Sequence, residues 1–285
     1  MIKLIECPRD AMQGLPDFID TAIKAAYINQ LLEVGFDTID FGSFVSPKAI
    51  PQMRDTAEVL SLLDLHNSKS KLLAIVANVR GAEDALTFPE IDYLGFPLSL
   101  SETFQQRNTN ASIAQALETV EEIQNRCEIK GKTLVTYLSM GFGNPYGDLY
   151  SPELVAEFVQ QLDEIGIKII SLSDTIGVAN PESIRSLFEI NVSSFPHIEF
   201  GAHLHSTRDT IPEKVLAGLA GGCMRFDGAL KGFGGCPMAK DELVGNMATE
   251  VMIDTLEASG EKLELNKIEL AEAMKLANYV FNPAI

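Results

Sequence analysis

The chain has 285 residues, 46% of them hydrophobic and 22% charged, which is the composition of a globular protein with ample apolar side chains for a core. Its 22 basic and 40 acidic side chains give a formal net charge of −18. This acidity argues against a nucleic-acid-binding protein, which needs clustered Lys and Arg, and against docking on an anionic membrane surface. We therefore expect neither nucleic acid nor a membrane among its partners.

The N-terminus and the cysteines indicate the compartment. The first ten residues, MIKLIECPRD, hold only a short apolar stretch and no small-residue cleavage site, unlike a signal peptide. No run of about 18 apolar residues occurs, which argues against a membrane-spanning helix. The four cysteines form no CxxC pair and are too few for a disulfide framework. We therefore expect a cytoplasmic protein in a reducing environment.

Short apolar runs bounded by Gly, Pro, Asn or Asp recur along the chain and predict strands. In chain order the expected strands are Ile2–Cys7, Thr38–Phe41, Leu72–Ala77, Tyr93–Phe96, Thr133–Ser139, Lys168–Ser173, Ile198–His203 and Met224–Ala229.

The segments between these runs have the periodicity of helices. Apolar residues recur at helical spacing over Phe18–Val34, and Gly35 is typical of a helix end. Ser151-Pro152-Glu153 combines an N-cap, a first-turn proline and a first-turn acid, and Asn180-Pro181-Glu182 repeats this start signal. Further helices are expected over residues 112–127, 151–165, 181–190 and 209–220, and from about 262 onward.

Strands that alternate with helices predict a parallel sheet, and eight of them predict an α/β fold, a single (β/α)8 TIM barrel over residues 1–260. Residues 261–285 are expected to form a C-terminal helix packed on the barrel within the same domain. The structural rival is an open doubly wound sheet. It usually has a glycine-rich phosphate loop after the first strand, and Cys7-Pro8-Arg9-Asp10 is not such a loop.

Polar side chains gather where the expected strands end, which in a barrel is the catalytic face. They are Glu6, Arg9, Asp10 and Gln13 after strand one, Asp40 and Ser43 after strand two, Tyr137 and Ser139 at strand five, Asp174 and Thr175 at strand six, His203 and His205 at strand seven, and Cys236 after strand eight.

His203 and His205 carry the strongest local signal for a metal site. Residues two apart on a strand point to the same face, so both imidazoles can reach one barrel mouth. Asp10, from the opposite end of the chain, is a natural anionic third ligand. Imidazole plus oxygen suits a divalent cation, Mg or Mn, with Zn as the alternative.

Arg9 and Cys236 are the candidate catalytic side chains around that site. Arg9 adjoins Asp10, and its guanidinium can stabilise a developing oxyanion with paired donors. Cys236 lies in the glycine-rich segment 231–239, which can bring a thiol over the substrate as acid, base or nucleophile. We interpret Cys7, Cys127 and Cys223 as buried packing residues.

Several motifs, spread over nearly the whole chain, resemble one family. They are Pro8-Arg9-Asp10 with Gln13, Ser43-Phe44-Val45-Ser46-Pro47-Lys48, Pro51-Gln52-Met53, Ser101-Glu102 with Phe104, Asn108 and Asn110, Asp174-Thr175-Ile176-Gly177-Val178, His203-x-His205, Gly232-Phe233-Gly234-Gly235-Cys236-Pro237 and Gly245-Asn246-Met247-Ala248-Thr249-Glu250. In these motifs the sequence resembles the 3-hydroxy-3-methylglutaryl-CoA lyases, within the wider barrel superfamily of metal-dependent acyl-CoA lyases and Claisen-type synthases.

The resemblance implies a retro-Claisen cleavage of 3-hydroxy-3-methylglutaryl-CoA to acetoacetate and acetyl-CoA, a step of leucine degradation. It implies that Asp10, His203, His205 and Asn246 bind the cation, that Arg9 stabilises the enolate and that Cys236 transfers a proton. We expect an acyl-CoA substrate, a homodimer, and substrate contacts from Gln13, Asp40, Ser43, Lys48, Tyr137, Ser139, Asp174 and Thr175.

The sequence also departs from the family pattern in one spacing and at four positions. Between Cys236 and Asn246 it has one residue more than the animal lyases. Glu6 precedes Arg9 by three residues where the family's acid stands four before. Asp40 replaces a usual Glu, Ser206 a usual Asp, and Val251 stands where an acid is common.

Three other functions stay open. One is a Claisen-type synthase of the isopropylmalate or citramalate kind, which joins acetyl-CoA to a 2-oxo acid with the same metal set. Another is an aldolase acting on a 4-hydroxy-2-oxo acid without CoA. The third is a catalytically silent barrel, against which the set of catalytic and ligand residues argues.

Overall fold

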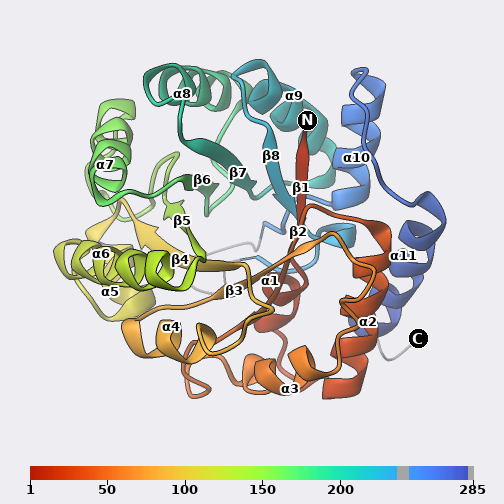
Figure 1. Ribbon diagram of the computed structural model, residues 1–285. Coiled ribbons are helices and arrows are strands. Elements are labelled where there is room, and N and C mark those ends of the chain that lie inside the picture. The colour runs from red at the N-terminus through yellow and green to blue at the C-terminus, as the bar shows by residue number, and fades with distance from the viewer. Residues whose placement is uncertain (236–243, 282–285) are drawn as a thin grey trace.

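The computed structural model describes residues 1–235 and 244–281, and its eight parallel strands close into a barrel in the order β1 to β8 (Figure 1). The predicted (β/α)8 fold is therefore confirmed. The strands are β1 Lys3–Glu6, β2 Thr38–Ser43, β3 Lys71–Ile75, β4 Tyr93–Ser99, β5 Thr133–Ser139, β6 Ile169–Asp174, β7 Glu199–Leu204 and β8 Arg225–Gly228.

Helices surround the barrel, and the predicted start signals of two of them are confirmed. Ser151 accepts a hydrogen bond from the amide of Leu154, and Asn180 and Ser183 form a capping box. Gly35 ends α2 in the left-handed conformation at φ 86°. The helices are α1 Pro8–Gln13, α2 Thr21–Val34, α3 Thr56–Ser61, α4 Val79–Ala85, α5 Glu102–Thr109, α6 Ile113–Lys130, α7 Pro152–Ile165, α8 Pro181–Ser194, α9 Ile211–Ala220, α10 Thr249–Ala258 and α11 Lys267–Phe281.

The sequence pattern does not predict α1, α3, α4, α5 or α10. These helices have six to ten residues, too few turns for the 3.6-residue period to stand out. Strand boundaries also shift, since β2 and β4 run on to Ser43 and Ser99. The extension of β2 includes an irregular register between Asp40 and Gly42. A side chain at Gly42 would meet Thr56 at 2.5 Å, so glycine is required there.

The barrel interior is apolar on one side and polar on the other. Leu73, Ile75, Val135, Tyr137 and Ile169, from β3, β5 and β6, form one buried apolar cluster. Facing them, β7 and β8 present polar groups, and the His203 ring lies edge-on to Tyr137 at 5.6 Å. The polar side chains inside the barrel are therefore concentrated on the β7 and β8 side, where β8 pairs with β1.

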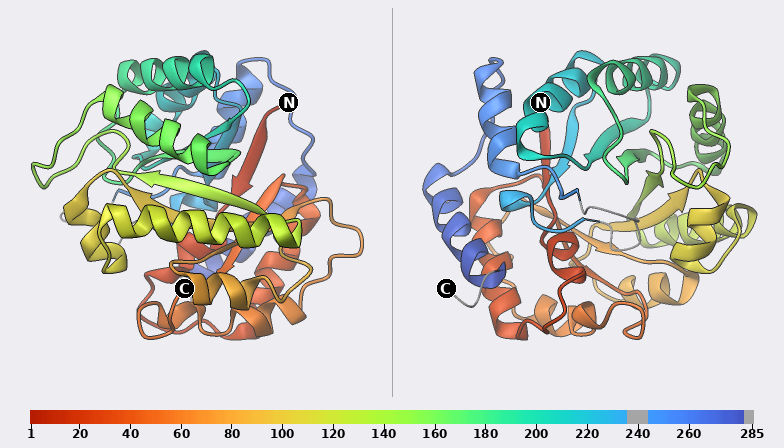
Figure 2. Two further views of the ribbon diagram at one scale, coloured as in Figure 1. Left: turned by 60° about the vertical axis from the view of Figure 1, so that its left-hand side comes forward. Right: turned by 180° about the vertical axis from the view of Figure 1, so that it is seen from behind.

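The C-terminal helix α11 packs beside α2 (Figures 1 and 2). Gln30 donates a hydrogen bond to Glu269 Oε2 at 2.7 Å, and the rings of Tyr27 and Phe281 meet edge to face at 5.9 Å. Leu270, Ala273 and Ala277 are buried in the same hydrophobic cluster as the barrel. In the back view of Figure 2, the short red helix α1 lies at the mouth of the barrel.

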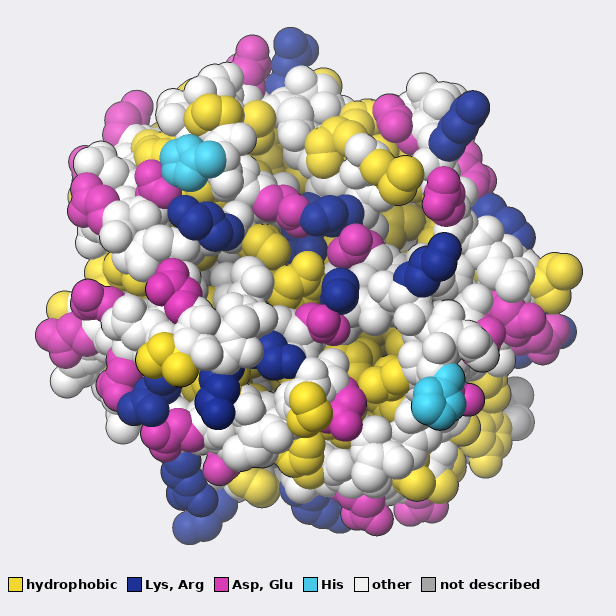
Figure 3. Space-filling view, in the orientation of Figure 1, with side chains coloured by type: hydrophobic (Ala, Val, Ile, Leu, Met, Phe, Trp, Pro, Cys, Tyr) yellow, Lys and Arg dark blue, Asp and Glu magenta, His cyan; other side chains and the backbone are white. Residues whose placement is uncertain are grey.

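The outer surface carries interspersed charges of both signs on the face that Figure 3 shows. No helix in the described part of the chain is long and apolar enough to span a membrane.

Candidate active site

The turn from β1 into α1 brings three candidate residues together. Pro8 begins α1 immediately after β1, so Arg9 and Asp10 stand at the mouth of the barrel, each only 7% exposed. Gln13, one turn later, donates to Asp10 Oδ1 at 2.7 Å and accepts from Arg9 Nη1 at 2.9 Å. Gln13 therefore fixes the other two side chains relative to each other.

Arg9 is held on Asp40 at the end of β2. Its Nε lies 3.2 and 3.1 Å from the two Asp40 oxygens, and Nη2 lies 2.5 Å from Oδ2. Nη1 also donates to Asp10 Oδ1 at 2.9 Å. These contacts leave one Nη2 hydrogen without an acceptor in the described part of the chain, and it can donate to a substrate oxygen.

Burial and charge set the ionisation of this pair. Burial lowers the pKa of Arg9, but the charges of Asp40 and Asp10 raise it by a larger amount, so the guanidinium stays charged. Burial raises the pKa of Asp40 to about 6, although the Arg9 charge opposes that rise. The pair is thus a fixed cation beside a carboxyl group that titrates close to neutral pH.

His205 presents a free ring nitrogen toward the same mouth. Its Nδ1 lies 3.0 Å from the carbonyl oxygen of Thr175, which assigns the hydrogen to Nδ1. Its Nε2 is buried without a hydrogen-bond partner among the described residues. Burial, assisted by His203, lowers the pKa of His205 to about 4. The ring is therefore neutral, as a metal ligand must be.

His203 is oriented from behind by Asp227 on β8. Its Nδ1 lies 3.2 Å from Asp227 Oδ2. Burial lowers the pKa of His203, but the hydrogen bond and charge of Asp227 outweigh it and raise the value overall. With Nδ1 donating to a carboxylate, Nε2 carries the lone pair, the usual arrangement behind a metal-bound histidine.

Asp10, His203 and His205 form one group whose ligand atoms lie within 4.8 Å of one another. Asn246 adjoins it and donates from Nδ2 to Asp10 Oδ2 at 2.7 Å and to the Phe233 carbonyl at 2.9 Å. Its amide oxygen is then the atom left to bind a cation. Two imidazoles, a carboxylate and an amide oxygen, with one buried nitrogen unpartnered, fit a divalent metal ion.

Asp174 lies beside this group, but its oxygens are already engaged. They accept from the amides of Val178 at 2.9 Å and Ala179 at 3.0 Å and from Lys214 Nζ at 3.1 Å. Lys214 also donates to the His205 carbonyl at 2.9 Å. Asp174 thus holds the loop after β6, and a direct contact with substrate stays a prediction.

The remaining predicted substrate contacts are distributed along the rim. Thr175 Oγ1 accepts from the amide of Met140, and Ser43 Oγ donates to the Ile75 carbonyl. Tyr137 and Ser139 are buried, and the Tyr137 hydroxyl has no partner among the described residues. Lys48 is exposed. Cys236 lies outside the described residues.

Asp227 and Lys214 are two polar residues of the site that the sequence analysis does not identify. Asp227 is an acid within an expected strand, two residues after Arg225, and such a polar pair on a buried strand is a signal of an interior polar site. Lys214 looks like a helix surface charge in the sequence, yet it is only 4% exposed.

Comparison with known proteins places this geometry among related enzymes. The HMGL-like family model matches residues 2–280. The hydroxymethylglutaryl-CoA lyase YngG of Bacillus subtilis is 36% identical over 268 residues, covering 94% of this chain and 89% of that protein. The 3-hydroxy-3-isohexenylglutaryl-CoA/hydroxy-methylglutaryl-CoA lyase of Pseudomonas aeruginosa is 34% identical over 255 residues, or 87% of this chain and 82% of that protein.

A solved structure is similar over nearly the whole barrel. It is an HMG-CoA lyase from Acinetobacter baumannii in complex with coenzyme A and 3-methylmalate, with a TM-score of 0.90 and 31% identity. The match covers 99% of this chain and 91% of that one.

Proposed function

This chain belongs to the HMGL-like family, and from that premise we propose that it is a carbon–carbon lyase that cleaves 3-hydroxy-3-methylglutaryl-CoA to acetoacetate and acetyl-CoA. The observation that carries the proposal is the Arg9–Asp10–His203–His205 constellation at the mouth of a barrel similar to HMG-CoA lyases.

We propose that Asp10, His203, His205 and Asn246 hold a divalent cation, Mg or Mn, with Zn as the alternative. When bound, such a cation would act as a Lewis acid and lower the pKa of the substrate's tertiary hydroxyl. The buried unpartnered Nε2 of His205 supports this assignment.

Asp40 is the proposed acceptor of the hydroxyl proton. Its pKa of about 6 leaves it ionised at neutral pH but basic enough to take a proton. Oδ1 is the more available oxygen, because among the described side chains it accepts only from Arg9 Nε at 3.2 Å, whereas Oδ2 also accepts from Nη2. Loss of the hydroxyl proton lets the C–C bond break, releasing acetoacetate and the enolate of acetyl-CoA.

Arg9 is the proposed electrostatic stabiliser of that enolate. Its guanidinium is buried and permanently charged, and one Nη2 hydrogen remains for the enolate oxygen. Because Asp40, Asp10 and Gln13 fix the group beforehand, little reorganisation is needed as charge develops.

Cys236 is the proposed proton donor to the enolate carbon. The described residues just before it include Gly232, Gly234 and Gly235, all at positive φ, a backbone that other residues rarely adopt. A side chain at Gly234 would meet Asn246 Nδ2 at 2.7 Å, so the backbone at Gly234 passes directly over a proposed ligand. A Cys236→Ala variant that retains full turnover would rule out this role.

We further propose that the protein is a cytoplasmic homodimer acting in leucine degradation, and that α11 belongs to the same domain as the barrel. The contacts of α11 with α2 and the shared hydrophobic cluster support the single domain. The HMG-CoA lyases among its relatives support the metabolic role.

The test is incubation of purified protein with 3-hydroxy-3-methylglutaryl-CoA and Mg or Mn. We expect equal amounts of acetoacetate and acetyl-CoA. Parallel reactions with acetyl-CoA plus a 2-oxo acid, and with a 4-hydroxy-2-oxo acid, test the synthase and aldolase alternatives. A longer branched analogue is included because the Pseudomonas aeruginosa relative is named for an isohexenyl substrate as well. If only the longer analogue gave product, the substrate would be an acyl-CoA with that longer acyl group and not 3-hydroxy-3-methylglutaryl-CoA.

A further inference from the structure

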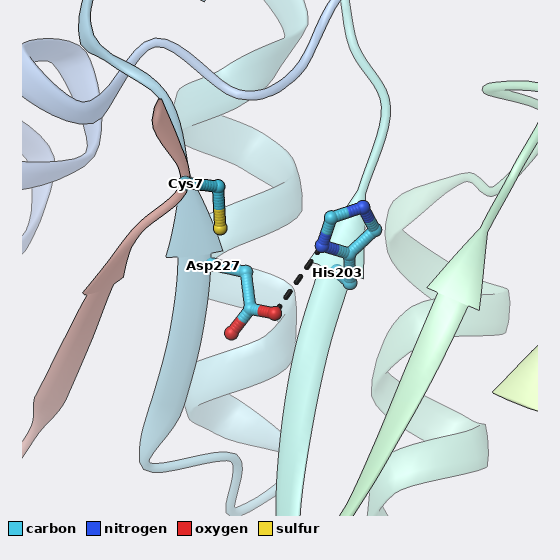
Figure 4. A group of neighbouring side chains, drawn as sticks. All are labelled: Cys7, His203 and Asp227. Carbon is cyan, nitrogen blue, oxygen red and sulfur yellow. Dashed lines mark hydrogen bonds and ion pairs between the residues drawn. The ribbon is translucent and has the colours of Figure 1, made fainter. Parts of the chain in front are cut away.

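Cys7, His203 and Asp227 form a second group of metal-ligating side chains, beside the one assigned to the reaction. One ligand atom from each lies within 4.8 Å of the others. Figure 4 shows the Cys7 thiol and the imidazole of His203 both directed toward the Asp227 carboxylate. Cys7 and Asp227 are fully or almost fully buried.

The barrel register brings these three residues together. Asp227 on β8 pairs with His203 on β7 and, on its other side, with Ile5 on β1. The Cys7 amide then donates to the Gly228 carbonyl at 2.8 Å, which keeps Cys7 next to the end of β8. Pro8 turns the chain into α1 directly afterwards. The cluster is therefore fixed by backbone contacts, not by mobile side chains.

The group has unused ligand capacity. Asp227 Oδ1 is buried with no hydrogen-bond partner among the described residues. Within residues 1–235 and 244–281, the Cys7 sulfur has only a long hydrogen-bond contact, 3.8 Å from the Ile5 carbonyl oxygen. Asp10 and Asp40 add negative charge around the thiol. Asp10, Asp40 and Asp227 still outnumber the neighbouring Arg9 and Arg225 cations. This charge balance and the buried unpartnered carboxylate oxygen favour a cation here.

The chemistry of the donors selects the kind of cation. A thiolate, an imidazole and a carboxylate are the ligands of Zn2+ and of softer ions such as Cd2+, whereas Mg and Mn prefer oxygen. The Asp10–His203–His205–Asn246 group contains no sulfur. The two groups therefore differ in metal preference although they share His203.

We propose that Cys7, His203 Nδ1 and Asp227 bind a thiophilic divalent cation, Zn2+ or Cd2+, and that this binding excludes the activating cation from the other group. On binding, the Cys7 thiol releases its proton to solvent, and the Nδ1 proton is transferred to Nε2 of the same ring. With Nε2 protonated, His203 cannot serve as a ligand beside Asp10 and His205. A neutral imidazole has one lone pair, so it supports one cation at a time.

The exclusion, but not the thiophilic site itself, rests on the proposed function of the Asp10–His203–His205–Asn246 group. The site can therefore be tested in metal-free protein, without an activity assay.

The first experiment is a Cd2+ titration of the full-length, metal-free chain, followed by the ultraviolet charge-transfer absorption of the cadmium–thiolate bond. Cys236→Ser removes the thiol that lies outside the described residues, and Cys7→Ser removes the proposed ligand. We expect the Cys236→Ser protein to keep a band that saturates at one Cd2+ per chain and the Cys7→Ser protein to lose it. Asp227→Asn should weaken Cd2+ binding by at least about 100-fold, because it removes the charge of a proposed direct ligand. A band that survives Cys7→Ser but disappears with Cys236→Ser would overturn the proposal.

The second experiment tests exclusion by the electron paramagnetic resonance signal of free Mn2+. In Cys236→Ser protein loaded with Mn2+, one equivalent of Cd2+ should release one Mn2+ as the thiolate band appears. Mn2+ that stays bound while the band reaches its full height would contradict the exclusion. A band missing from both the Cys236→Ser and the wild-type protein, while the wild type cleaves 3-hydroxy-3-methylglutaryl-CoA, would refute this proposal alone and leave the proposed function intact.

Discussion

The Nδ1 of His205 lies 3.0 Å from the carbonyl oxygen of Thr175, and this contact leaves Nε2 buried and unpartnered beside Asp10. A buried ring nitrogen without a partner is costly unless something binds it. The backbone carbonyl of Thr175, just after β6, thus fixes the orientation of the His205 ring, just after β7. This contact links the loop after β6 to the proposed metal ligands.

Replacing His205 by Ala should therefore weaken Mn2+ binding by at least about 100-fold, since losing a direct ligand costs more than losing a residue that only supports one. Isothermal titration calorimetry on the folded variant measures this. Lys168→Ala, at the opposite end of β6, is the matched control and should bind Mn2+ as the wild type does. A His205→Ala protein with unchanged affinity would remove His205 from the ligand set.

Asp40→Asn should lower kcat by about 100- to 10,000-fold, because the variant loses the proposed proton acceptor and the charge that holds Arg9. Mn2+ affinity should change little, since Asp40 is not a proposed ligand. Asp40→Glu keeps the carboxylate on a longer side chain and should retain more activity than Asn. Equal activity of the Asn and wild-type proteins would show that Asp40 is dispensable.

Lys214→Met should destabilise the fold by about 3 to 5 kcal/mol, because it leaves the Asp174 carboxylate buried without its ion-pair partner. Chemical denaturation measures the free energy of unfolding. The double variant Lys214→Met, Asp174→Asn removes both charges and should recover part of the loss. If the double variant lost more free energy of unfolding than the two single variants lose when their losses are added, this account of the pair would be contradicted.

Glu6 should make stability depend on pH. It is fully buried, its Oε1 accepts from the Leu230 amide and its Oε2 from Thr249 Oγ1. Burial raises its pKa from 4.5 to about 8. Between these values the folded protein keeps a proton on Glu6 that the unfolded chain releases. The contribution of Glu6 to stability is therefore fully present at or below pH 4.5 and declines up to pH 8.

One pKa unit corresponds to about 1.4 kcal/mol, so this decline should amount to about 3 to 5 kcal/mol. Glu6→Gln removes the titrating group and should flatten that part of the stability curve, measured by denaturation from pH 5 to 9. Parallel curves for the two proteins would mean that Glu6 does not titrate in this range.

Much of the fold follows from local sequence pattern. Strand runs, helix caps and the order of elements are local properties, and eight alternating units leave few topologies. That Arg9, Asp10, His203 and His205 meet follows as well, because the carboxyl ends of all barrel strands share one rim.

The supporting contacts could not be predicted in the same way. Asp227 reaches His203 only because β7 and β8 pair in one register, and sequence spacing does not reveal a register. Lys214 reaches Asp174 from α9, where the sequence suggests a solvated charge. Asp174 is an acid at the end of an expected strand, which suggests a substrate contact. In the structure its oxygens accept hydrogen bonds from three donors of the protein.

The most direct test of the central claim compares wild-type and Arg9→Met protein with 3-hydroxy-3-methylglutaryl-CoA and Mn2+, measuring acetoacetate and bound Mn2+ in the same samples. The wild type should form acetoacetate and acetyl-CoA in equal amounts. Arg9→Met should still bind Mn2+ but lose about 100- to 1,000-fold in turnover, the effect of removing one donor to a developing oxyanion. No product from the wild type with Mn2+ or Mg2+, or full turnover by Arg9→Met, would contradict the assignment.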